Sequence, residues 1–340
     1  MNAQREQGVA LGYTLSGEEF GPRDLVRFAR RAEEAGFDFA SISDHYHPWV
    51  DRQGNSPFAW TVIGALAEAT DRIAVGTGVS CPTIRVHPAI VAQAAATAAA
   101  MLPGRFWLGV GSGENLNEHI LGDRWPETAV RQEMLEEAIE VIRSLWQGGL
   151  TSHHGRHYTV ENARLYTLPD EPPPIIVAAA GARATELAAR AGDGLFGLAP
   201  DREMIERFER AGGEGKPRFG QLHVCWGENE DEAKHTALEW WPNALVAGGA
   251  TWELPLPSHF EAASDWAGPD DIAEAVVCGP DPERHAEAIR EFAAAGYDHV
   301  YLHQVGPDQE GFLDFAQREL LPRLEDVRGT QATFSGAAAR

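Results

Sequence analysis

The sequence contains little cysteine and little positive charge. Its three cysteines, Cys81, Cys225 and Cys278, lie far apart and form no CxxC pair. This spacing disfavours a disulfide framework and a structural zinc site, and it is compatible with a reducing cytoplasm. The formal net charge is −23, which argues against a nucleic-acid partner because phosphate recognition requires a basic face.

Long apolar runs are also absent. No run reaches the roughly 20 apolar residues that span a bilayer. The first residues, MNAQREQGVALGY, lack the basic and then apolar segments of an export signal. We therefore expect a cytoplasmic protein with no membrane partner. A hydrophobic content of 44% and a charged content of 23% are typical of a globular chain.

Eight short apolar segments alternate with helical patterns along the chain. Strands are expected at 11–16, 37–43, 72–80, 105–113, 174–181, 194–199, 220–227 and 297–306. Helices are expected at 22–36, 56–70, 88–101, 129–147, 182–191, 201–211, 282–295 and 310–325. Continuous apolar strands are typical of parallel sheets buried on both faces. The count favours a (β/α)8 TIM barrel over an open doubly wound sheet.

Two segments interrupt this alternation. Residues 148–173 are expected to form a hairpin, and residues 228–281 a long insertion rich in Trp, Pro and small residues. Insertions of this size on a barrel commonly form lids or substrate walls. We expect a single barrel domain over residues 1–330, followed by a flexible tail at 331–340.

Functional side chains and small residues gather where the expected strands end. SISDHYHPW ends the second strand, GTGVSC the third, GVGSGENLNE the fourth and AAAGARA the fifth. Active sites of barrels lie at the carboxyl ends of the strands, so we predict an active site here. Taken alone, each stretch also has a structural explanation, such as packing aromatics or glycines that permit a positive φ.

Other motifs point less clearly to chemistry. GVGSGE lacks the third glycine of a dinucleotide fingerprint. Backbone N–H groups near Arg183 can cradle a phosphate or simply reflect tight strand-to-helix packing. The histidines of HHGRHY do not have zinc-site spacing, so we expect no metal. Trp240 and Trp241 are expected to pack in the lid or core.

Several ordered blocks carry a family resemblance that runs from about Leu11 to Leu324. They are SDHYHPW, SPFAW, PTIRVHPAIVAQAAAT, GRFWLGVGSGENLNEHILGDRWPE and ELAARAGDGLF, following the opening LGYTLSGEEFGPRDLVRFARRAEEAG. In these blocks the chain resembles the coenzyme F420-dependent glucose-6-phosphate dehydrogenase family of the luciferase-like monooxygenase superfamily. The resemblance implies a TIM barrel that binds the deazaflavin F420 and oxidises or reduces a small molecule.

The resemblance also implies site residues. His45 matches a catalytic histidine, acting as a base or an orienting group, Trp49 matches a tryptophan that flanks the substrate, and Glu114 matches an acid near the ring. A cis peptide bond is implied between Gly78 and Val79. The implied cofactor-binding residues are Asp44, Gly78, Val79, Cys81, Asn117, Ala179, Ala180 and Gly181. His47 matches no catalytic position and is expected at the substrate wall or rim.

The implied chemistry is consistent with these residue types. Oxidation of an alcohol requires a base at the hydroxyl and a hydride acceptor facing the carbon. An imidazole such as that of His45 suits the first role. Glu114 is expected to exchange a proton with the reduced deazaflavin ring or to form a hydrogen bond with it. The hydride step belongs to the cofactor, while the protein orients the reactants.

The sequence departs from the family pattern at the substrate phosphate. Two lysines and one arginine that hold the phosphate in the family align with Asp201, Ala262 and Ala275, and no lysine follows Lys234. Each lost charge-assisted hydrogen bond is worth roughly 1.5–3 kcal/mol. We therefore expect the substrate to be a neutral alcohol, an unphosphorylated sugar or another neutral carbonyl/alcohol couple rather than glucose 6-phosphate.

Three alternatives remain open from the sequence. One is an FMN-dependent luciferase-like monooxygenase, although SDHYHPW together with GSGENLNE argues against it. Another is an F420-dependent sugar-phosphate dehydrogenase with a different phosphate site. The third is a cofactor carrier without catalysis. By analogy with related barrels, we expect a homodimer.

Overall fold

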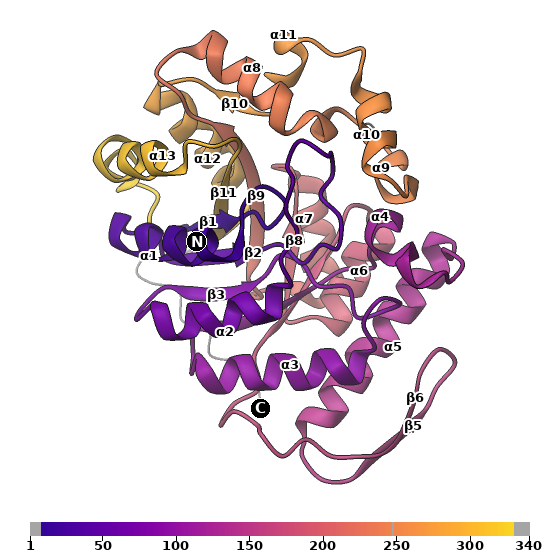
Figure 1. The fold of residues 1–340 in the computed structure, drawn as a ribbon. Coiled ribbons are helices and arrows are strands. Elements are labelled where there is room, and N and C mark those ends of the chain that lie inside the picture. Colours follow the sequence, from indigo (N-terminus) through magenta and orange to yellow (C-terminus); the bar gives the residue numbers. More distant parts are fainter. Residues whose placement is uncertain (1–7, 247, 330–340) are drawn as a thin grey trace.

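Eight parallel strands close into a barrel in the computed structural model, which describes residues 8–246 and 248–329 (Figure 1). The strands follow the order β1, β2, β3, β4, β7, β8, β9, β11, and β11 pairs with β1 to close the ring. They are β1 (Ala10–Leu15), β2 (Phe39–Ile42), β3 (Ala74–Thr77), β4 (Phe106–Val110), β7 (Ile175–Ala178), β8 (Gly194–Gly197), β9 (Arg218–Cys225) and β11 (His299–Gln304). The predicted TIM barrel is confirmed. A short β10 (Val277–Cys278) adds to β9 outside the ring.

Helices follow the strands and cover the barrel. They are α1 (Pro22–Ala35), α2 (Ala59–Ala69), α3 (Pro88–Met101), α5 (Thr128–Trp146), α6 (Ala182–Ala191), α7 (Arg202–Phe208), α12 (Pro282–Ala295) and α13 (Gln309–Phe315). α2 starts three residues later than the sequence predicts, and α7 and α13 end several residues early. After α7 the chain forms a π turn in which Gly212 has a φ of 103°. After α13 a π turn leads into a 3-10 turn around Pro322, which has no N–H to continue an α-helix.

Aromatic rings fill the amino-terminal end of the barrel interior. One inward residue from each strand forms this cluster, namely Ala10, Phe39, Ala74, Trp107, Ile176, Phe196, Phe219 and Tyr301. Phe39 and Trp107 meet edge to face with ring centroids 5.5 Å apart. A Cβ at Gly12 would lie 2.3 Å from the Phe39 ring, so glycine there makes room for the ring. The barrel is therefore closed at this end.

Small residues occupy the next inward positions on the opposite, carboxyl side. Because side chains along a strand alternate between faces, the residues two places after Phe39, Trp107 and Ile176 also point inward. They are Ser41, Gly109 and Ala178. On these three strands the carboxyl mouth of the barrel is consequently lined by small side chains, above a floor of aromatic rings.

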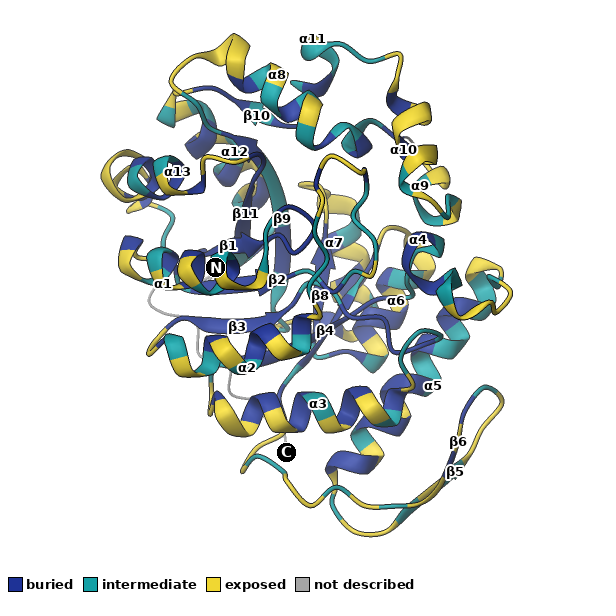
Figure 2. Cartoon of the chain, viewed as in Figure 1, coloured by how far each residue is buried: buried dark blue, intermediate teal, exposed yellow. Residues whose placement is uncertain are grey.

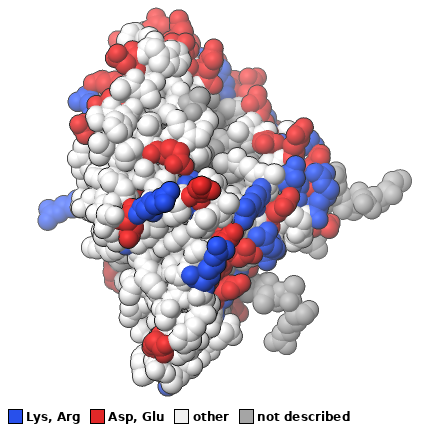
Figure 3. All heavy atoms as spheres, turned by 90° about the vertical axis from the view of Figure 1, so that its right-hand side faces the viewer, with Lys and Arg blue, Asp and Glu red and all other residues white. Residues whose placement is uncertain are grey.

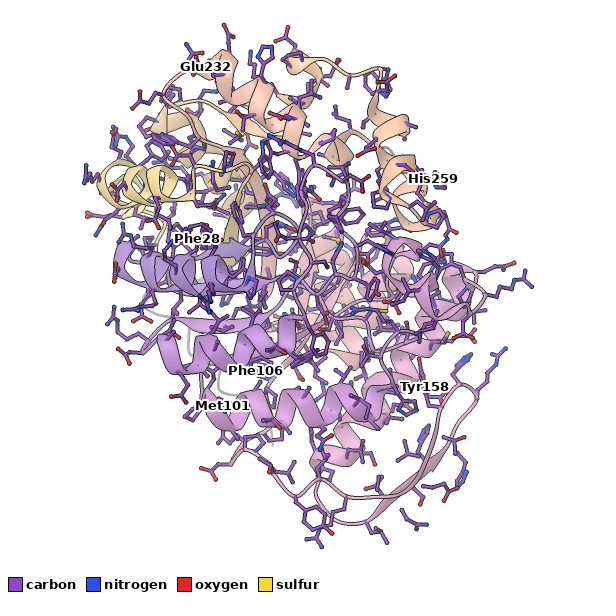
Figure 4. The ribbon with its side chains drawn as sticks, viewed as in Figure 1. Phe28, Met101, Phe106, Tyr158, Glu232 and His259 are labelled. Atoms are coloured by element: carbon purple, nitrogen blue, oxygen red, sulfur yellow. The ribbon has the colours of Figure 1, made fainter. Side chains whose placement is uncertain are left out.

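The hairpin of β5 (Thr151–His154) and β6 (Thr159–Ala163) projects from the barrel and is largely exposed (Figure 2). Glu137 on α5 anchors its turn by accepting hydrogen bonds from the backbone N–H groups of His157 and Tyr158. The Tyr158 hydroxyl donates to the Thr83 carbonyl over 3.0 Å (Tyr158 is labelled in Figure 4). No group of potential metal ligands occurs among the described residues, the histidines of this hairpin included.

The insertion between β9 and β11 forms a helical cap over one side of the molecule (Figure 1). It contains α8 (Glu230–Trp240), α9 (Ala250–Glu253), α10 (Pro257–Ser264) and α11 (Pro269–Ile272). Trp241 is buried in a cluster with Cys225, Cys278 and Val305. Within residues 8–246 and 248–329, no helix has the length and apolar character needed to cross a membrane.

Candidate active site

The loop after β2 brings an acid, an imidazole and an indole to the barrel mouth. Asp44 is 4% exposed. Its carboxylate accepts a hydrogen bond of 2.6 Å from the Ser80 hydroxyl and forms an ion pair of 3.1 Å with Arg85. Asp44 therefore links the loop after β2 to the loop after β3.

Arg85 connects three consecutive strand ends. Besides Asp44, its guanidinium lies 3.5 Å from the carboxylate of Glu118, and its backbone N–H donates to the same carboxylate over 2.7 Å. Burial raises the pKa of Glu118, although Arg85 opposes this shift. Removing either buried partner would leave an uncompensated charge. Arg85 lies in the PTIRVHP block, but the sequence analysis did not single it out.

His45 is paired with a buried acid from the first strand end. Its Nδ1 lies 3.4 Å from Oε1 of Glu18, which is 2% exposed, and 3.2 Å from the His47 carbonyl. Ser43 donates a hydrogen bond of 2.6 Å to the same carboxylate. Burial alone would raise the pKa of Glu18, but His45 and Ser43 bring it below its usual value. The sequence analysis missed Glu18, although it lies three residues after the end of β1.

Trp49 stands between His45 and the helical cap. Its ring centroid lies 4.9 Å from that of His45 and 5.2 Å from that of Phe260 on α10. The buried Gln53 side chain accepts from the Trp49 N–H over 2.8 Å and donates to the Trp240 carbonyl over 2.8 Å. The cap is thus hydrogen-bonded to the loop that carries the candidate catalytic residues.

Glu114 and Asn117 join the loop after β4 to the loop after β2. The Asn117 side-chain oxygen accepts from the backbone N–H groups of Tyr46 and His47, over 2.8 and 3.1 Å. Its amide nitrogen donates to the Glu114 carboxylate over 3.3 Å. Glu114 is half-buried. His47 lies beside this contact.

The end of β3 has an unusual backbone. The Gly78–Val79 peptide bond is cis, as the family resemblance implies. Cys81 is buried, and its sulfur lies 2.9 Å from the Thr83 hydroxyl. Burial and then Glu118 raise the pKa of this thiol well above its usual value. Cys81 is therefore a neutral thiol rather than a nucleophile.

The end of β7 leads into α6 through Ala179, Ala180 and Gly181. Gly181 is exposed, and no atom lies within 4 Å of a Cβ built on it. The first N–H groups of a helix have no intrahelical partners and attract anions. Arg183 lies at the same helix start, 3.7 Å from Glu133. Open space, small residues and backbone donors are compatible with an incoming phosphate.

The three positions aligned with the family's phosphate-binding cations lie on separate elements. Asp201 caps α7 by accepting from the Met204 N–H over 3.0 Å. Ala262 is on α10, and Ala275 follows α11. All three are exposed. None of them supplies a positive charge.

A parallel barrel whose mouth carries a buried acid–imidazole pair, an aromatic wall and a cis peptide defines a luciferase-like barrel. Residues 3–299 match the family model described as luciferase-like monooxygenase. The chain is 37% identical over 330 residues to the F420-dependent glucose-6-phosphate dehydrogenase of Nocardia farcinica, covering 93% of this chain and 98% of the relative. The corresponding enzyme of Tsukamurella paurometabola is 35% identical over 331 residues, covering 93% and 98%.

Solved structures give the same result. An F420-dependent secondary alcohol dehydrogenase in complex with an F420–acetone adduct superposes with a TM-score of 0.87 at 31% identity, over 94% of this chain and 100% of that chain. The F420-dependent tetrahydromethanopterin reductase of Methanopyrus kandleri, at 21% identity and a TM-score of 0.76 over 94% and 100%, shares the fold. The chain belongs to the luciferase-like monooxygenase family, within its branch of F420-dependent dehydrogenases.

Proposed function

We propose that this protein is an F420-dependent oxidoreductase that transfers a hydride between the carbon of a neutral alcohol or sugar and C5 of the deazaflavin. The observation that carries the proposal is the pairing of His45 with the buried Glu18 carboxylate at the barrel mouth. The 37% and 31% identical relatives support the choice of cofactor.

The residues at the strand ends fit this cofactor. We propose that the Gly78–Val79 segment, Cys81 and Asn117 border the flat ring of the cofactor, next to the small inward side chains of β2, β4 and β7. The α6 start at Ala179, Ala180 and Gly181 would receive the phosphate. Asp44, in the loop after β2, would bind the cofactor while Arg85 holds its carboxylate in place. When bound, F420 supplies the hydride acceptor or donor.

The protein's own contribution to the reaction is orientation and proton transfer. Because Nδ1 of His45 faces Glu18 and the His47 carbonyl, Nε2 is left to accept the proton of the substrate hydroxyl. As the hydroxyl loses this proton, the hydride leaves the carbon that bears the hydroxyl. The Glu18 carboxylate stabilises the imidazolium that results. Trp49 would flank the reacting carbon of the substrate, and Glu114 would lie near the deazaflavin ring.

The substrate is proposed to be uncharged. Asp201, Ala262 and Ala275 provide no cation for a phosphate group, and Asp201 adds a negative charge beside α7. The nearest competing activity is that of the glucose-6-phosphate dehydrogenases to which the chain is similar. A phosphate site elsewhere in the barrel would permit that activity.

Steady-state kinetics distinguish these activities. Purified protein is incubated with oxidised F420 and 2-propanol, glucose or glucose 6-phosphate, and loss of cofactor absorbance is followed. We expect turnover of a neutral substrate and a kcat/KM for glucose 6-phosphate at least roughly tenfold lower, since even one missing charge-assisted bond is worth about 1.5 kcal/mol. Efficient use of the phosphate ester would contradict the proposal. Parallel titration with FMN tests the other cofactor.

The assembly and location are also proposed. We propose that the chain is a single barrel domain, that it forms a homodimer and that it is located in the cytoplasm. Light scattering, which measures the mass of the assembly, tests the homodimer. Basic side chains on the face shown in Figure 3 lie among acidic ones, and pairs such as Arg190–Glu136 and Arg156–Glu133 neutralise charge at α5. This pattern supports a small-molecule enzyme without a nucleic-acid partner.

A further inference from the structure

Two further imidazoles lie inside the same barrel mouth, away from His45. His223 on β9 and His303 on β11 are register partners on adjacent parallel strands. Their ring centroids are 5.2 Å apart. Both positions are inward because His303 lies two residues beyond Tyr301, which belongs to the interior cluster. They follow the aromatic floor toward the carboxyl end, where the reaction takes place.

His303 is held by the acid next to Glu18. Its Nε2 lies 2.7 Å from the carboxylate of Glu19, whose other oxygen accepts from the Gly306 N–H over 2.8 Å. Consecutive acids of one loop thus hold two imidazoles, Glu18 facing His45 and Glu19 facing His303. His303 is 1% exposed, and its Nδ1 has no hydrogen-bond partner among the described residues.

His223 is deep in the barrel and uncharged. Burial, and then the neighbouring His303, lower its pKa to about 3. Its side chain is nevertheless half-buried rather than sealed. No hydrogen bond to its ring occurs within residues 8–246 and 248–329. Trp241 covers both imidazoles, with ring centroids 5.6 Å from His223 and 4.2 Å from His303.

The buried, unpaired Nδ1 of His303 requires a polar partner. A hydroxyl group pairs with an imidazole nitrogen in either protonation state, because it both donates and accepts hydrogen bonds. An anionic group is disfavoured, since the carboxyl groups of Glu18 and Glu19 are buried beside this site. The partner that best fits is therefore a neutral hydroxyl.

We propose that His223 and His303 bind a second hydroxyl of the substrate, so that the enzyme acts on a neutral polyhydroxylated compound, such as a vicinal diol or an unphosphorylated sugar, rather than on a simple monoalcohol. This inference rests on the proposed function. His45 would take the proton of the reacting hydroxyl, and the second pair of imidazoles would fix which carbon faces the hydride acceptor. Glu19 is a positioning residue, because it acts through His303.

The first test compares substrates. The F420-loaded enzyme is assayed with 2-propanol, 1,2-propanediol and glucose. We expect kcat/KM to be at least roughly tenfold higher for the diol or the sugar than for 2-propanol, the effect of one well-placed hydrogen bond. A preference for 2-propanol would overturn the inference and leave the proposed function intact. Absence of turnover with every alcohol would instead overturn the proposed function.

The second test uses variants. His223→Leu leaves no known partner unpaired, so the fold is expected to tolerate it. It should raise KM for 1,2-propanediol roughly tenfold and leave KM for 2-propanol within a factor of about two. His303→Leu should raise the same KM but should also destabilise the fold, because it leaves the buried Glu19 carboxylate without its imidazole partner. His303→Asn, which keeps a polar atom near the Nδ1 position, should recover part of the binding loss. His235→Asn on the exposed face of α8 is the matched control. Equal effects on both substrates would contradict the inference.

A binding measurement separates recognition from turnover. Enzyme carrying reduced F420 cannot oxidise an alcohol, so glucose or 1,2-propanediol forms a stable complex. Nitrogen NMR of the labelled histidines should show shifts of the His223 and His303 signals, assigned from the leucine variants, on addition of the diol or sugar. We expect no comparable shift with 2-propanol. Shifts confined to His45 would contradict the second hydroxyl site.

Discussion

Nδ1 of His45 lies 3.4 Å from the Glu18 carboxylate, although the two residues come from different strand ends. Glu18 is 2% exposed and is held by Ser16 and Ser43 as well. A buried carboxylate at this place fixes the orientation of the imidazole and favours its protonated form as the substrate hydroxyl loses its proton. The pair is therefore the centre of the proposed mechanism.

Glu18→Gln keeps the shape of the side chain and removes its charge. We expect kcat to fall by roughly 10- to 100-fold, because a hydrogen bond to a charged group is worth about 1.5–3 kcal/mol, while KM changes little. Steady-state kinetics with the best neutral substrate provide the measurement. Glu137→Gln, in the hairpin anchor, is a control for loss of a mostly buried carboxylate (12% exposed) outside the site. An unchanged kcat in Glu18→Gln would remove Glu18 from the mechanism.

The same residue predicts a pH dependence of stability. Burial alone would raise the pKa of Glu18, but His45 and Ser43 lower it from its usual 4.5. A carboxyl whose pKa is lower in the folded state stabilises the fold above about 4.5, and this contribution is lost as the pH falls through the folded-state pKa. The difference in free energy of unfolding between the native protein and Glu18→Gln should therefore shrink below about pH 4.5. Urea unfolding at several pH values measures it, and a constant difference would refute the expectation.

Arg85 should be a principal stabilising residue of the site. Arg85→Met leaves the buried carboxylates of Asp44 and Glu118 without their cation, and we expect a loss of roughly 3–5 kcal/mol in free energy of unfolding. Arg85→Lys should lose less, because it keeps the charge but not the forked geometry. Urea unfolding gives the values. Arg156→Met, an exposed residue with one ion pair, is the control; an equal loss in both would count against the role of Arg85.

The fold was largely predictable because it depends on local patterns. Apolar strands that alternate with amphipathic helices mark each barrel unit, so every expected strand is present. The errors lie at helix ends. The pattern over 310–325 continues past the point where Pro322 interrupts the backbone hydrogen bonds. A periodicity of apolar residues records which face is buried, and it does not record where the helical geometry changes.

The site was predictable only in part, because its key contacts join distant segments. His45 and Trp49 were identified from one block. Glu18 belongs to another loop, 25 positions before Ser43, the neighbour of His45 that donates a hydrogen bond to it. Arg85 contacts Asp44 across 41 positions. No local spacing shows such pairs. Two consecutive acids just after the first strand were the available signal, and they would have pointed to Glu18.

Gly181 tests the proposed phosphate seat. Its φ of −176° suits any residue, and no atom lies within 4 Å of an added Cβ. Gly181→Val should therefore keep the fold, at a cost of about 1 kcal/mol because Val caps a helix less well than Gly, and weaken F420 binding roughly tenfold or more, because the new side chain occupies the approach to the α6 N–H groups. Fluorescence titration with F420 measures the affinity. Gly64→Val on α2, which also has open space, is the control; equal F420 affinity in both variants would place the phosphate elsewhere.

Asp201 should stabilise the fold. The family resemblance implies a phosphate-binding cation at this position instead. The Asp201 side chain caps α7 by accepting from the Met204 N–H, so Asp201→Ala should cost about 1 kcal/mol in free energy of unfolding, whereas Asp201→Asn, which also caps well, should cost only a few tenths. Urea unfolding distinguishes the two variants. A loss of only a few tenths in Asp201→Ala would show that the cap contributes little.

Asp201→Lys then separates the structural role from the substrate role. This variant loses the cap and introduces one of the three missing cations. Because Ala262 and Ala275 still provide no charge, we expect only a small gain in kcat/KM for glucose 6-phosphate, below roughly tenfold, together with the stability loss of the alanine variant. Kinetics with glucose and glucose 6-phosphate, measured side by side, give the ratio. A gain of several orders of magnitude would mean that a phosphate site already exists near α7 and that only the charge of Asp201 had kept it unused.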